Sequence, residues 1–166
     1  MIMNDNWKSQ FQRRMNRFSA PRSGRGSAIS IKVRVTGGCF HRQHSPHAYN
    51  LIDDYLQGCT SLDAHFEEHE SGPELLVWLA MGTAGITLAK SVIDLVTAII
   101  KARSEGIKKG DSPSAPVELI VRKVITDDKI IEEKVLRFDF KDEVNTEQIE
   151  KALIKALEKI ANNNEE

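Results

Sequence analysis

The residues most able to bind a metal or take part in catalysis are one cysteine and five histidines in a short stretch of the sequence. All five histidines lie between residues 41 and 69, and Cys39 stands just before them. Thiolate sulfur and imidazole nitrogen are ligands that zinc prefers in proteins. The spacing C-x-H-x2-H-x2-H matches no established metal signature, so we expect no cofactor and keep a metal site as an alternative only. Its candidate ligands are Cys39, His41, His44, His47, His65 and His69.

Other catalytic chemistry has little support. Gly37, Gly38 and Arg42 stand beside a predicted helix start and could hold an anion, but the sequence has neither G-x-G-x-x-G nor the P-loop pattern. The acidic run at residues 67–70 has no apolar surroundings that would raise a carboxyl pKa. No serine or cysteine stands in a recognisable nucleophile setting. The sequence therefore predicts a protein that is not an enzyme.

Charge and cysteine content bear on the compartment and the partners. The 23 basic and 24 acidic side chains nearly balance, so no bulk attraction to nucleic acid is expected. No apolar signal segment follows Met1, and two cysteines in such a chain are typical of free thiols. We expect a cytoplasmic protein.

A basic aromatic arm is expected over residues 1–27. Its apolar side chains recur at spacings of four, four and three, as in an amphipathic helix, and residues 19–27 form a breaker-rich linker. Such an arm could dock on a partner or on an anionic membrane, or remain an unordered terminus. The residues predicted to bind a partner are Trp7, Phe11, Arg14, Met15 and Phe18.

The longest apolar stretch, residues 75–100, contains only two charges, Lys90 and Asp94. Its apolar residues recur at spacings of four and three, which predicts one long helix over about residues 72–104, buried in its domain or facing a partner. A membrane span is the alternative for this length, but the two charges count against it. The predicted helix seam consists of Leu79, Gly82, Ile86, Ala89, Ile93 and Val96.

The remaining elements predict an α+β fold over residues 28–161, followed by an acidic tail at 162–166. Alternation indicates strands at about 29–36 and 62–66, joined by a helix that begins near residue 46, so these two strands should run parallel. A hairpin is predicted over 117–140, with a bulge near Glu132 or Glu133, and a last helix over about 145–160 with Ala152 and Ala156 on its apolar face. The order β-α-β-α-β-β-α describes a two-layer sandwich of four strands and helices.

Residues 28 to about 161 resemble the bacterial family called effector-associated constant component, first type. The resemblance rests on ISIKVRVTG at 29–37, NLIDDYLQG, LAMGTAGITLAKSVIDLVTAIIKAR, VELIVRKV and the closing hairpin and helix. The arm and the histidine-rich loop depart from the family pattern. The resemblance implies a non-enzymatic component, encoded beside effector proteins in bacterial conflict systems, that couples sensing to an effector such as a protease or nuclease.

The resulting hypothesis is an adaptor or scaffold of a bacterial defence system, active in antiviral immunity. It would form a homo-oligomer or a hetero-complex and dock an effector encoded nearby through the long helix and the arm. Two alternatives stay open. One is a single-span membrane protein with a small cytosolic α+β domain, and the other is a metal- or anion-binding domain at the histidine-rich edge.

Overall fold

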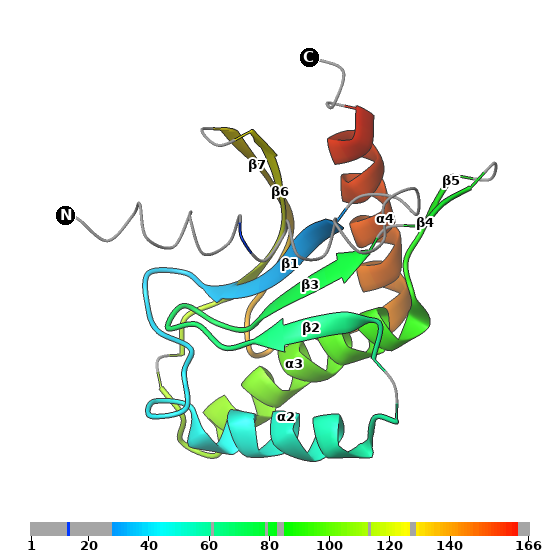
Figure 1. Cartoon of the computed structure of the whole chain (residues 1–166). Helices are drawn as coiled ribbons and strands as arrows, with labels where there is room; N and C mark the ends of the chain where they lie inside the picture. The colour runs from blue at the N-terminus through cyan, green and yellow to red at the C-terminus, as the bar shows by residue number, and fades with distance from the viewer. Residues whose placement is uncertain are drawn as a thin grey trace.

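The computed structural model describes residue 13 and residues 28–60, 62–78, 80–82, 85–112, 114–126 and 129–162. Over these ranges the chain forms a five-stranded sheet, a separate two-stranded hairpin and three helices (Figure 1). In chain order the elements are β1 (Ala28–Val35), α2 (Pro46–Gly58), β2 (Ala64–Glu67), β3 (Glu74–Trp78), β4 (Ala80–Gly82), β5 (Gly85–Thr87), α3 (Lys90–Lys108), β6 (Val117–Thr126), β7 (Lys129–Phe138) and α4 (Thr146–Asn162).

The large sheet has the order β2-β3-β1-β6-β7, and every neighbouring pair is antiparallel. Strand β1 lies at its centre, where Ile29, Ile31 and Val33 face the core with at most 1% of their surface exposed. Strands β1 and β2 both run antiparallel to β3, so they are parallel to each other, but β3 lies between them. The α+β class is confirmed, with five strands in the sheet where four were predicted.

The predicted long helix over residues 72–104 is wrong, because this segment forms β3, the β4–β5 hairpin and α3 in succession. Strand β3 pairs on both sides, with β1 and with β2, so it is an interior strand of the sheet. Hydrophobic spacing alone cannot distinguish a short buried strand from a buried helix segment. Gly82 and Gly85, each of which would cost about 1 kcal/mol in a helix, pair with each other across the two strands β4 and β5.

The predicted helix seam is therefore divided among separate elements. Gly82 lies in β4, Ile86 in β5, Ala89 just before α3, and Ile93 and Val96 within α3, whereas Leu79 lies outside the described residues. Ile93 and Val96 are 2% and 0% exposed, so their side chains lie in the interior of the domain. The membrane alternative rested on the same long helix. Among the helices of the described ranges, none is both long enough and apolar enough to cross a membrane.

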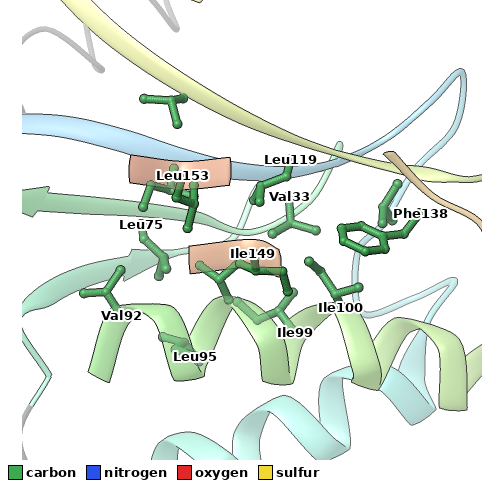
Figure 2. Packing of buried hydrophobic residues seen from close by; sticks show 14 of the residues in the cluster. Val33, Leu75, Val92, Leu95, Ile99, Ile100, Leu119, Phe138, Ile149 and Leu153 are labelled. Carbon is green, nitrogen blue, oxygen red and sulfur yellow. The ribbon is translucent and has the colours of Figure 1, made fainter. Parts of the chain in front are cut away.

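The helices enclose one hydrophobic core against the sheet. In both figures α3 lies between the sheet and α2, and Figure 2 shows Leu95, Ile99 and Ile100 of α3 beneath Val33 and Leu75. Helix α4 adds its own apolar stripe beside β6, β7 and α3. The members of that stripe are Ile149, Leu153, Leu157 and Ile160.

Candidate functional site

The residues predicted to bind a partner through the arm, Trp7, Phe11, Arg14, Met15 and Phe18, lie outside the described residues. Their role stays a prediction.

The six candidate metal ligands separate into three places. Cys39, His41 and His44 come together in the loop between β1 and α2, where one ligand atom from each lies within 4.8 Å of the others. His47 lies in the first turn of α2, where its backbone N–H donates to Asp111 Oδ1 at 3.2 Å. His65 and His69 lie beside β2 and β3 and pair there with carboxylates.

The pairs of these last two histidines belong to a charge cluster on the sheet face opposite the core. His65 Nε2 lies 3.1 Å from Glu67 Oε1, and His69 Nε2 lies 3.0 Å from Glu74 Oε1. The other oxygen of Glu74 is 3.5 Å from Arg122 Nη1, and Arg122 Nε is 2.6 Å from Glu132. His69 Nε2 also lies 3.6 Å from Glu67 Oε2, so contacts with carboxylates connect β2, β3, β6 and β7.

Burial and neighbouring charges shift the pKa values of two residues on this face, Glu74 and Lys32. Glu74 and Lys32 are each 3% exposed. Burial would raise the pKa of Glu74, but a hydrogen bond from His69 and the charges of Lys32 and Arg122 outweigh it and lower that pKa to about 2. Burial lowers the pKa of Lys32 to about 8, although Glu74 opposes this effect. A carboxylate with a pKa near 2 is a poor general base or acid at neutral pH, so the cluster is suited to holding strands together.

A groove of about 370 Å³ lies between β7 and α4. Its apolar lining consists of Val135 from β7 with Ala152 and Ala156 from α4, and we call these three residues the floor. Its rim is lined by lysines from both elements, namely Lys134, Lys155 and Lys159. Strand β7 ends the sheet order, so the groove runs along a sheet edge.

Local sequence explains how this groove forms. The β6–β7 register passes from Leu119 opposite Leu136 to Ile120 opposite Lys134, which leaves Val135 as an extra residue on β7. Such a bulge redirects side chains, and Val135 here lines the groove. The observed bulge at Val135 lies two or three positions beyond the predicted one at Glu132 or Glu133. On α4, alanines one turn apart leave space where larger apolar residues would fill it.

The groove carries net positive charge. Glu133 lines it together with the three lysines, so these residues carry two more positive charges than negative ones. Lys159 lies 3.1 Å from Glu133, and Lys134 lies 3.3 Å from Glu118, with Lys134 and Lys159 each more than 60% exposed. Sequence analysis did not identify this groove, and the small size of Ala152 and Ala156 was the one signal that pointed to it.

Searches against protein-family models, curated proteins and solved structures found no match to this chain. The resemblance to the effector-associated constant component family accordingly stays a prediction.

Proposed function

We propose that this protein is a non-enzymatic, cytoplasmic adaptor that binds an extended acidic segment of a partner protein in the groove between β7 and α4. The observation that carries the proposal is the combination of an edge strand, an apolar floor and a lysine rim in one groove. An extended peptide can join an exposed sheet edge through main-chain hydrogen bonds, while alternate side chains enter a neighbouring pocket.

The composition of the groove selects the occupant. Val135, Ala152 and Ala156 favour small or branched apolar side chains in the partner, because the side chains of these three residues are themselves apolar. The lysine rim favours carboxylates on the intervening positions of a strand, whose side chains alternate in direction. An acidic segment with alternating apolar residues satisfies both requirements.

The family resemblance supports the biological setting of the proposal. It suggests that the partner is an effector encoded nearby, and that the adaptor takes part in a bacterial defence or conflict system. Co-expression with each neighbouring gene product, followed by gel filtration with light scattering, tests this setting. A complex of defined mass that Lys155→Glu disrupts supports it, whereas absence of a complex with every neighbour contradicts it.

A simpler assay tests the groove itself. A fluorescein-labelled octapeptide that alternates valine and aspartate is titrated with the full-length protein, and its anisotropy is compared with that of a valine-lysine octapeptide. We expect saturable binding of the acidic peptide only, and about fivefold weaker binding after Lys155→Glu, since a charge reversal on the rim removes about 1 kcal/mol.

Lys151→Glu provides the matched control. It makes the same charge change on the same exposed side of α4, one turn from Lys155, but Lys151 does not line the groove. Equal weakening by the two variants would indicate general charge attraction and contradict a groove. Absence of binding by the acidic peptide would contradict the proposal directly.

A further inference from the structure

The loop between β1 and α2 places three metal-ligand side chains on one short segment. Cys39, His41 and His44 each offer one ligand atom, and these atoms lie within 4.8 Å of one another. The imidazole rings of the two histidines are 4.4 Å apart between centroids. In a tetrahedral zinc site the ligand atoms are about 3.3–3.6 Å apart, as follows from Zn–N and Zn–S bonds of about 2.0–2.3 Å. The three ligand atoms therefore need to approach one another by at most about 1.5 Å.

The residue between the first two ligands is anchored in the core. Phe40 has no exposed surface, and its backbone N–H donates to Glu70 O at 2.8 Å. Its carbonyl accepts a hydrogen bond from the Tyr49 hydroxyl at 2.8 Å. The guanidinium of Arg103 stacks 5.1 Å from the ring centroid of Phe40. With Phe40 fixed, Cys39 and His41 are held beside each other at the partly exposed surface of the loop.

The segment that joins the second and third ligands is fixed as well. The backbone N–H groups of His44 and Ser45 both donate to His41 O, at 3.1 and 2.9 Å, which closes a tight turn. Arg42 lies between Asp53 and Glu68 and makes hydrogen bonds of 2.6–2.8 Å to both carboxylates. Preorganised ligands lose little conformational freedom when a metal binds.

We propose that Cys39, His41 and His44 form a zinc-binding site with a fourth, water-occupied position. Sulfur together with nitrogen favours zinc over calcium or magnesium, which prefer oxygen. Three protein ligands and an open position distinguish such a site from a closed structural site with four. Gln43 N donates to His41 Nδ1 at 3.2 Å. Zinc replaces this hydrogen bond if it binds Nδ1, whereas binding at Nε2 requires the ring proton to move to Nδ1.

Cobalt substitution tests this site in the full-length chain, purified without a histidine tag and freed of metal. One equivalent of Co²⁺ should produce visible bands of tetrahedral cobalt and a near-ultraviolet band of thiolate-to-cobalt charge transfer, and one equivalent of Zn²⁺ should remove both. Cys39→Ser should abolish the charge-transfer band. His41→Asn and His44→Asn should each weaken cobalt binding at least tenfold.

Cys59→Ser and His65→Gln are the matched controls, because neither residue belongs to the cluster. Both should keep the full cobalt spectrum and the affinity of the unaltered chain. Circular dichroism checks that the ligand variants stay folded, as their partly exposed positions predict. Absence of a charge-transfer band at one equivalent overturns the proposal, and so does its loss in Cys59→Ser with retention in Cys39→Ser.

Discussion

Glu74 is the residue whose replacement tests the charge cluster most directly. Its pKa is lowered from 4.5 to about 2, which corresponds to about 3 kcal/mol of stability from its charged form. We expect Glu74→Gln to lower the free energy of unfolding by about 3 kcal/mol at pH 7. Removing one member of a buried pair leaves its partner less compensated: buried Lys32 loses the opposite charge that acts on it most strongly, whereas Arg122 keeps its ion pair with Glu132.

The pH dependence of this loss distinguishes a charge effect from a packing effect. A carboxyl group whose pKa is lower in the folded than in the unfolded protein stabilises the fold above its unfolded pKa, and this stabilisation is lost as the pH falls through the folded pKa. The difference between the original chain and Glu74→Gln should therefore be full above about pH 5 and fall to about half at pH 3. Urea unfolding followed by circular dichroism at both pH values measures it.

Glu105→Gln is the control, because Glu105 is 53% exposed and forms an exposed ion pair of 3.4 Å with Lys108. It should change stability by less than about 0.5 kcal/mol at either pH. If Glu74→Gln loses the same stability at pH 7 and at pH 3, the charge of Glu74 does not cause the loss. The assignment of its low pKa to the cluster would then be refuted.

Two further predictions concern backbone and alkaline stability. Because burial lowers the pKa of Lys32 to about 8, stability should rise by about 2 kcal/mol between pH 8 and pH 10, and Lys32→Met should flatten this rise; a flat curve for the unaltered chain would contradict it. The urea titration stops at pH 10 because burial raises the pKa of Tyr49, which opposes the trend at higher pH. Gly72→Ala should cost at least about 2 kcal/mol in thermal or urea unfolding, because Gly72 has a φ of +141° and an added Cβ would lie 1.8 Å from Val33 O. Gly58→Ala, with nothing within 4 Å of the added Cβ, should be neutral or slightly stabilising, and equal losses at both positions would contradict the argument.

Local sequence patterns were sufficient to predict β1 and α4. The alternation at residues 29–35 identified β1, since one face of this strand contributes only aliphatic residues to the core. The apolar face predicted over about 145–160 identified α4, whose start is capped by Asn145, because Asn145 Oδ1 accepts a hydrogen bond from Glu147 N at 2.8 Å. Both signals depend on neighbours in the sequence.

The prediction for the long apolar stretch was wrong because its secondary structure depends on strands that are distant in the sequence. Residues 74–78 become a strand because β1 and β2 both offer backbone groups for pairing, and no local pattern shows this. Cys39, His41 and His44 lie together in the loop before α2, whereas His47 lies in the first turn of α2 and His65 and His69 pair with Glu67 and Glu74 on the sheet. The groove requires β7 to be an edge strand, which follows only from the sheet order.

Arg103 shows how the core and the proposed zinc loop depend on each other. It lies near the end of α3, where a cation favours the helix dipole, yet it is 2% exposed. Its guanidinium donates to Ser45 Oγ at 3.3 Å and to Ala115 O at 3.2 Å while it stacks on Phe40. Burial lowers the pKa of Arg103, and the charge of Asp111 counteracts this effect. Asp111 in turn accepts hydrogen bonds from the first turn of α2, so one buried pair of charges connects the end of α3, the start of α2 and the loop that carries the metal ligands.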